Sequence, residues 1–338
     1  MRTKPKTSTT AVLLGLLIAF FVLGSCADGE RARTLKLAHG LDQNHSVHKA
    51  MVFMAQRVEE KSGGRLLMDV YPGGQLGTER ENAEMLQIGS LAITKVSAAI
   101  LEGFAPSYAL FGLPFLFQDK AHLHRVLDSD IGRELLLDTE RYWLRGLTFY
   151  DAGSRSFYTS KRPILHPDDL RGLKIRVMQS PSAIAMIRAF GGSPTPLSWG
   201  ELYTALQAGV VDGAENNPPS FVLSHHYEIS RYYSLTEHTT IPDVLAISTK
   251  VWNTLSAQEQ QWVQEAADES AQYQRILWEA SERETLERAR QAGVQILIPD
   301  KAPFIERVQG MHAEMKRDPR FEDLINRIQA KRDTTLVQ

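Results

Sequence analysis

The sequence GLKIRVMQS (residues 172–180) reads as a β-strand that leads directly into a helix. Apolar residues at positions 173, 175 and 177 alternate with Lys174 and Arg176, which predicts one apolar and one polar strand face. Ser180, followed by a proline, is typical of a helix N-cap and first helical turn. Arg176 is therefore expected near the carboxyl end of a strand, the edge at which open α/β sheets bind ligands.

The same alternation of strand and helix extends in both directions from this stretch. Strands are predicted at 34–38, 65–71 and 90–96, separated by helices, and the pattern restarts near Leu147. Strands joined by single helices favour right-handed crossovers and mostly parallel sheets. We therefore predict an α/β protein with two lobes. The expected boundaries are 34–152 plus 242–280 for lobe I and 153–241 plus 281–330 for lobe II.

A long helix is predicted near the C-terminus. Ser256 and Glu259 have the spacing of a capping box, the helical pattern continues to about Gln291, and Gly293 is a stop signal. At 1.5 Å per residue such a helix is roughly 50 Å long. Because this length exceeds the diameter of one lobe, we expect the helix to span both lobes.

The N-terminal residues 1–26 have the features of a secretory signal peptide. Basic residues at positions 2, 4 and 6 precede an apolar run over 11–23, which is too short for a comfortable membrane span. The run ends in LGSC at Cys26, the only cysteine, which fits a bacterial lipobox and a lipid anchor; cleavage after Ala27 fits equally well. Either way the sequence predicts export to the periplasm without disulfides.

Composition excludes several classes of function. The chain has 338 residues, 43% of them hydrophobic, and a formal net charge of −2, which argues against nucleic acid as a partner. It contains no G-x-S-x-G, H-E-x-x-H, P-loop or dinucleotide-binding motif, so neither catalysis nor a cofactor is predicted. His39, His45 and His48 lie close together, but no acidic residue or cysteine completes a metal-binding spacing, and no metal site is expected.

Polar residues at predicted strand ends indicate a site for a small anion. Arg155 and Arg176 each follow or end a strand, and Asn216 and Asn217 lie in a turn closed by prolines. The planar guanidinium of arginine matches a carboxylate through two hydrogen bonds, while amide side chains suit hydroxyl groups.

Several longer stretches then resemble one family. GLKIRV, GGSPTPLSWGELYTALQAGVVDGAENNP (191–218), YPGGQLGTERENAEMLQIGSLAITKVSAA (71–99) and FGLPFLF (111–117) are similar to the substrate-binding proteins of tripartite ATP-independent periplasmic (TRAP) transporters, the DctP family. The resemblance covers the chain from about Leu35 to the long helix. It implies a periplasmic-binding-protein fold, type II-like, with hinge strands and a lobe-spanning helix. It also implies a non-enzymatic, monomeric receptor that delivers a carboxylate-bearing solute to membrane permease subunits.

The resemblance also implies roles for individual residues. Arg176 is expected to bind the ligand carboxylate, with Arg155 and Asn216 beside it. The remaining expected ligand contacts are His45, Glu79, Lys95, Ser97, Gln179, Trp199 and Asn217. The combination resembles the branch that binds hexuronates such as glucuronate and galacturonate, with lobes closing about hinges near residues 152 and 242. The alternatives are another organic acid (diketogulonate, an aldonate or a C4-dicarboxylate), a sensory receptor, or a secreted hydrolase of acidic sugars.

Overall fold

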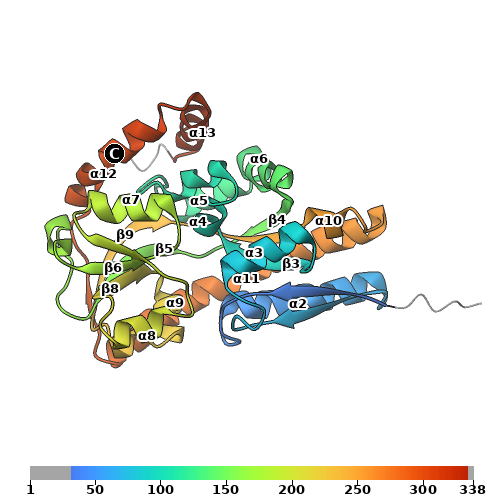
Figure 1. Cartoon of the computed structure of the whole chain (residues 1–338), viewed down its shortest axis with the longest axis horizontal. Helices are drawn as coiled ribbons and strands as arrows, with labels where there is room; N and C mark the ends of the chain where they lie inside the picture. The colour runs from blue at the N-terminus through green and yellow to red at the C-terminus, as the bar shows by residue number, and fades with distance from the viewer. Residues whose placement is uncertain (1–31, 334–338) are drawn as a thin grey trace, which may run out of the picture.

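The computed structural model describes residues 32–333, which form two α/β lobes side by side (Figure 1). Lobe I contains a five-stranded sheet with the order β2-β1-β3-β10-β4, and lobe II a six-stranded sheet with the order β11-β9-β5-β8-β6-β7. The predicted two-lobe α/β fold is confirmed. The predicted signal peptide (1–26) and Cys26 lie outside the described residues. Within 32–333, no helix has the length and apolarity needed to cross a membrane.

The elements follow one another closely along the chain. The strands are β1 (Arg33–Ala38), β2 (Leu66–Tyr71), β3 (Ile93–Ser97), β4 (Leu144–Tyr150), β5 (Ser154–Thr159), β6 (Lys174–Val177), β7 (Ser193–Pro196), β8 (Gly213–Asn216), β9 (Tyr232–Thr240), β10 (Asp243–Ser248) and β11 (Gln295–Leu297). The α-helices are α2 (Ser46–Ser62), α3 (Glu79–Ile88), α4 (Ala98–Leu101), α5 (Lys120–Leu127), α6 (Asp130–Asp138), α7 (Pro181–Ala189), α8 (Leu202–Gln207), α9 (Pro218–Leu223), α10 (Thr249–Trp252), α11 (Ala257–Gln291), α12 (Ala302–Met315) and α13 (Pro319–Gln329).

Both sheets contain strands of both directions. In lobe I, β10 runs antiparallel to its two neighbours, and in lobe II β5 does the same. Each sheet is otherwise parallel, so the prediction of mostly parallel sheets is confirmed and these two strands are its exceptions. Each enters its sheet directly from the other lobe instead of through a helical crossover, so it begins at the edge where its neighbours end. A crossover helix, by contrast, returns the chain in the same direction.

The chain crosses between the sheets at Asp151–Gly153 and at residues 241–242. The Asp151 backbone is held by the Gln274 side chain of α11, which accepts its N–H at 2.9 Å and donates to its carbonyl at 2.8 Å. Gly153 has φ 58°, and a Cβ there would lie 2.5 Å from Glu282 Oε1. These crossings coincide with the predicted hinge positions near 152 and 242, while the hinge motion itself stays a prediction.

Helix α11 runs along both lobes, as the sequence predicts (Figure 1). The Ser256–Glu259 capping box is present, and the 35 residues of the helix correspond to roughly 50 Å. Trp278 is buried in the core of lobe I, whereas Ala289 is buried in the core of lobe II. The predicted lobe boundary at residue 280 falls between these two side chains.

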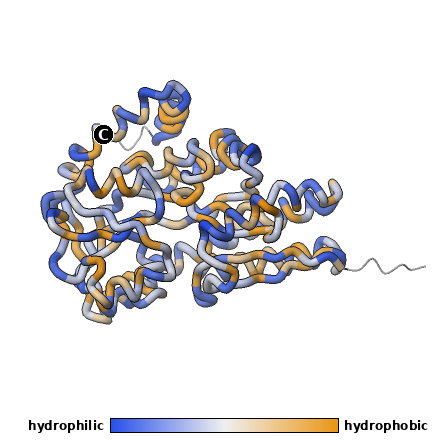
Figure 2. Tube along the Cα trace, viewed as in Figure 1, coloured by the Kyte–Doolittle hydropathy of each residue, from blue (hydrophilic) through white to orange (hydrophobic). Residues whose placement is uncertain are grey.

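The last two helices pack on different lobes. Phe304 of α12 lies in the lobe II core, whereas Leu324, Ile325 and Ile328 of α13 lie in the lobe I core. The prediction that all of 281–330 belongs to lobe II is therefore wrong for α13. Hydrophobic residues alternate with hydrophilic ones along the outer helices (Figure 2). Such a pattern indicates that one face is buried, but it does not say which lobe covers that face.

Candidate functional site

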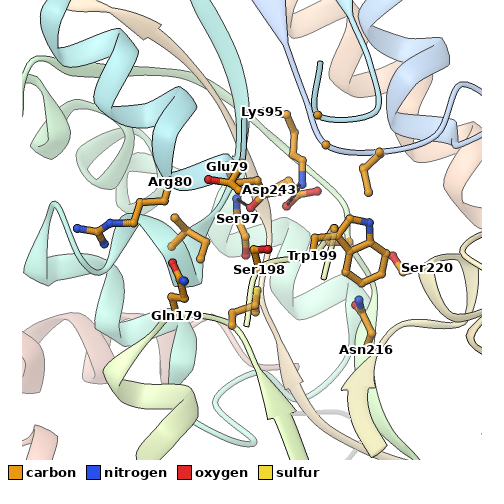
Figure 3. A pocket seen from close by; sticks show the side chains of 18 of the residues that line it. Glu79, Arg80, Lys95, Ser97, Gln179, Ser198, Trp199, Asn216, Ser220 and Asp243 are labelled. Carbon is orange, nitrogen blue, oxygen red and sulfur yellow. Dashed lines mark hydrogen bonds and ion pairs between the residues drawn. The ribbon is translucent and has the colours of Figure 1, made fainter. Parts of the chain in front are cut away.

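A cavity of about 310 Å³ lies between the two lobes, beside the interlobe crossings (Figure 3). Lobe I supplies one wall from β3, α3 and β10, and lobe II supplies the other from β5, β6 and β8. The ten predicted ligand contacts all line this cavity: His45, Glu79, Lys95, Ser97, Arg155, Arg176, Gln179, Trp199, Asn216 and Asn217. The structure therefore brings these residues together, and their contact with a ligand stays a prediction.

Arg176 is a buried cation for which the described chain supplies no carboxylate. It is 2% exposed, and its Nε and Nη2 donate to the Leu197 carbonyl at 3.0 and 2.8 Å. Its Nη1 has no hydrogen-bond partner among residues 32–333. Burial lowers the pKa of Arg176, and the Trp199 ring lies 5.9 Å from the guanidinium carbon. An unpaired buried charge is unfavourable, so this guanidinium suits an external anion.

Arg155, by contrast, is paired within the chain. Its Nε donates to Glu215 Oε2 at 2.5 Å, its Nη2 donates to Glu215 Oε1 at 2.8 Å, and its Nη1 donates to Asn216 Oδ1 at 2.7 Å. Burial raises the pKa of Glu215, but the charges and hydrogen bonds of Arg155 and His238 together outweigh burial and hold that pKa at about 2. The antiparallel pairing of β5 with β8 causes this contact, because it sets Phe157 opposite Glu215. Arg155 lies two residues before Phe157 on the same face of β5, so it is the diagonal neighbour of Glu215. The Arg155 charge is already compensated, which the sequence did not reveal.

The lobe I wall carries a buried ion-pair group of Glu79, Lys95 and Asp243. Lys95 Nζ donates to Glu79 Oε1 and, at 3.2 Å, to Asp243 Oδ1. Glu79 Oε2 also accepts the Ser97 N–H at 3.1 Å. Burial alone would lower the pKa of Lys95, but the two carboxylates raise it, while burial raises the pKa of Asp243. Two carboxylates therefore face one ammonium group on this wall (Figure 3).

Three buried side-chain nitrogens at the cavity donate to nothing within the described residues: His45 Nε2, Arg176 Nη1 and Trp278 Nε1. His45 Nδ1 accepts the Val47 N–H at 3.2 Å, which caps α2 and leaves the ring proton on Nε2. Burial, reinforced by the Lys95 charge, lowers the pKa of His45 to about 3, so the ring is neutral. Donors without acceptors favour a ligand rich in oxygen acceptors.

Two of the predicted contacts also hold the backbone in place. Asn217 Oδ1 accepts the Ser220 N–H at 2.8 Å at the start of α9, and its Nδ2 donates to the Ala152 carbonyl at 2.9 Å. Ser97 Oγ accepts the Ala99 N–H at 3.4 Å at the start of α4. These side chains therefore link the cavity wall to the first interlobe crossing and to α4.

The histidines near the N-terminus do not gather as a metal site. His39 Nε2 and His48 Nδ1 lie 3.0 Å apart and bond to each other, while His45 caps α2. Across residues 32–333, no cluster of three His, Cys, Asp or Glu side chains is arranged to hold a metal ion.

Glu215, Asp243 and Trp278 are among the residues at the site that were not predicted as ligand contacts, and so are Arg80 and Ser198. Glu215 lies within the AENN motif, so its position at a strand end was visible in the sequence. Asp243 is the polar first residue of a mostly apolar strand and lies beside the predicted hinge, which is a usable signal. Trp278 lies inside a long helix in which apolar and polar residues are only weakly separated onto two faces. No local signal in the sequence therefore indicates that Trp278 faces the cavity.

Comparisons with known proteins agree with this geometry. The family model described as bacterial extracellular solute-binding protein, family 7, matches residues 37–318. A protein of Salmonella typhimurium is 39% identical over 301 residues, which cover 88% of this chain and 92% of that protein. A TRAP periplasmic solute binding protein from Xanthobacter autotrophicus, crystallised with β-D-galacturonate, is 40% identical with a TM-score of 0.85, covering 88% of this chain and 99% of that one. Another TRAP periplasmic solute binding protein, from Chromohalobacter salexigens with bound D-glucuronate, is 33% identical with a TM-score of 0.86. The match covers 88% of this chain and 100% of that one.

Proposed function

This chain belongs to the DctP family, family 7 of the bacterial extracellular solute-binding proteins, and we propose that its solute is a hexuronate, D-galacturonate or D-glucuronate. It is a TRAP solute-binding protein, and the family consists of receptors that bind solutes. The two TRAP binding proteins compared above hold these sugar acids, which supports the same substrate class here.

The unpaired guanidinium of Arg176 carries this proposal. No acceptor for its Nη1 is present in the described part of the chain, and its other two nitrogens share one neutral carbonyl. A ligand carboxylate would supply both the missing acceptor and the missing charge. Because the site is buried, the resulting ion pair would be strong, and removal of one partner from such a pair costs about 2–5 kcal/mol.

The rest of the cavity suits the hydroxyl-rich part of a sugar acid. His45 Nε2 and Trp278 Nε1 offer hydrogen bonds to oxygen acceptors, and the carboxylates of Glu79 and Asp243 accept bonds from hydroxyl groups. Trp199 offers a flat ring beside Arg176. A volume of about 310 Å³ lies at the small end of ligand pockets, which favours one sugar ring over an oligomer.

The binding cycle follows from the position of the cavity. The carboxylate binds Arg176 on lobe II, and the lobes close about the crossings near residues 152 and 242, which brings the Glu79–Lys95–Asp243 wall onto the sugar. The closed monomer, free in the periplasm or held there by a lipid on Cys26, then delivers the solute to the TRAP permease subunits in the membrane.

A thermal-shift screen of the purified mature protein tests the substrate class. We expect D-galacturonate or D-glucuronate, at a hundred times its dissociation constant, to stabilise the protein by about 2.7 kcal/mol. The screen includes aldonates, diketogulonate, C4-dicarboxylates and amino acids. A shift with these compounds and none with any hexuronate would contradict the proposal. NMR of the recovered solute should show it unchanged, whereas product formation would favour a hydrolase.

A further inference from the structure

We propose that the acidic wall of lobe I restricts the cavity to solutes with a single carboxylate, so that the site rejects aldaric acids, the diacids that correspond to the hexuronates. This inference rests on the proposed function, in which Arg176 binds the hexuronate carboxylate. It adds a second basis for choosing between solutes, at the end of the solute opposite the carboxylate that Arg176 binds.

The cavity offers one cation that lacks a carboxylate partner among the described residues. Within residues 32–333, Arg176 has only the Leu197 carbonyl as an acceptor. Arg155 is held on both Nε and Nη2 by the Glu215 carboxylate. Lys95 is held by Glu79 and Asp243. Arg80, which also lines the cavity, is paired with Glu84 at 3.2 Å. A first solute carboxylate therefore finds an unpaired guanidinium, whereas a second one finds cations that already have carboxylate partners.

The wall opposite Arg176 carries more negative than positive charge. The side chains of Lys95, Glu79 and Asp243 are 5%, 16% and 10% exposed, so water screens them weakly. Two carboxylates surround one ammonium group, and a further carboxylate would have to displace one of them or lie beside both. Like charges brought together in a buried site repel each other strongly and oppose binding.

The two ends of the cavity face each other closely enough to act on one small solute. Glu79 and Arg176 both line the same cavity of about 310 Å³. A hexuronate bound through its carboxylate presents ring hydroxyl groups to the lobe I wall, and hydroxyl groups can donate to Glu79 and Asp243. An aldarate presents a second carboxylate instead, which has no proton to donate at neutral pH.

Calorimetric titration of D-galacturonate and galactarate into the mature protein tests the inference. We expect galactarate to bind at least ~100-fold more weakly than galacturonate. Asp243→Asn and Glu79→Gln each remove one negative charge but keep an oxygen that can accept a hydrogen bond from Lys95. Each should reduce the ratio of galacturonate affinity to galactarate affinity at least ~tenfold. Glu287→Gln, on an exposed part of α11 outside the cavity, is the matched control and should leave the ratio unchanged.

The outcomes separate this inference from the proposed function. Wild-type protein that binds galacturonate and galactarate equally well would overturn the inference and leave hexuronate binding in place. The inference would also be overturned if both cavity variants, with thermal unfolding like that of wild type, kept the full discrimination. Failure of every hexuronate to bind would instead overturn the proposed function.

Discussion

Arg155 and Arg176 are two arginines of similar burial, 5% and 2% exposed, on the strands that flank β8. Arg155 is bound by the Glu215 carboxylate, whereas the residues that the structure describes give Arg176 one backbone carbonyl and no partner for its Nη1. Burial is thus the same, but the counter-charge differs. The comparison teaches that a buried arginine stabilises the fold when the chain supplies its partner, and is available to a solute when the chain does not.

The largest expected effect is on stability, in Arg155→Met. This change leaves the buried Glu215 carboxylate without its cation, and breaking a buried ion pair in this way costs about 3–5 kcal/mol. Arg176→Met is the matched variant and should lose little or no unfolding free energy, because it removes an unpaired buried charge. Urea unfolding of both variants without solute measures the difference. Equal losses would show that the two arginines do not differ in this way.

The same pair should make part of the stability depend on acid pH. The pKa of Glu215 is about 2 in the folded protein, against 4.5 when exposed, so its contribution is present above about pH 4.5 and is lost as the pH falls toward 2. At 1.36 kcal/mol per pKa unit this amounts to about 3 kcal/mol. The stability difference between wild type and Glu215→Gln should therefore shrink from pH 5 to pH 2. A constant difference over that range would contradict the pairing.

A smaller effect is expected on the solute side of the comparison, at His45. His45→Asn keeps a side-chain oxygen that can cap α2, but it removes the Nε2 donor. The loss of one neutral hydrogen bond, about 0.5–1.5 kcal/mol, should weaken hexuronate binding by about 2- to 13-fold. Calorimetry measures the affinity, and thermal unfolding without solute checks that the cap is kept. Unchanged affinity would exclude a role for Nε2.

Local sequence patterns account for much of the fold and for the position of the site. Alternating apolar residues predict strands such as β6, and Ser180 and the Ser256–Glu259 pair predict where α7 and α11 begin. These signals are local, because periodicity and capping depend on a few neighbouring residues. Ser97, Arg176 and Asn216 line one cavity because parallel strands bring their carboxyl ends to the same edge of each sheet. Arg155 reaches the same cavity from the amino end of the antiparallel strand β5.

The features that the sequence did not reveal depend on contacts between distant segments. The direction of β5 and β10 follows from the chain crossing between lobes, and the partner of α13 is set by the whole lobe I surface. Whether Arg155 or Arg176 is compensated depends on strand register, which lets Glu215 bond directly to Arg155 and sets Arg176 opposite Ala214. Residue type and spacing alone therefore could not separate the two arginines.

The role of Arg176 is tested most directly by calorimetric comparison of D-galacturonate with D-galactose, in which a neutral hydroxymethyl group replaces the carboxylate. We predict that wild-type protein prefers the acid by about 2–5 kcal/mol, or roughly 30- to several-thousand-fold, and that Arg176→Met loses this preference. An Arg176→Met variant that still preferred galacturonate to the wild-type extent would contradict the assignment of Arg176 as the carboxylate anchor.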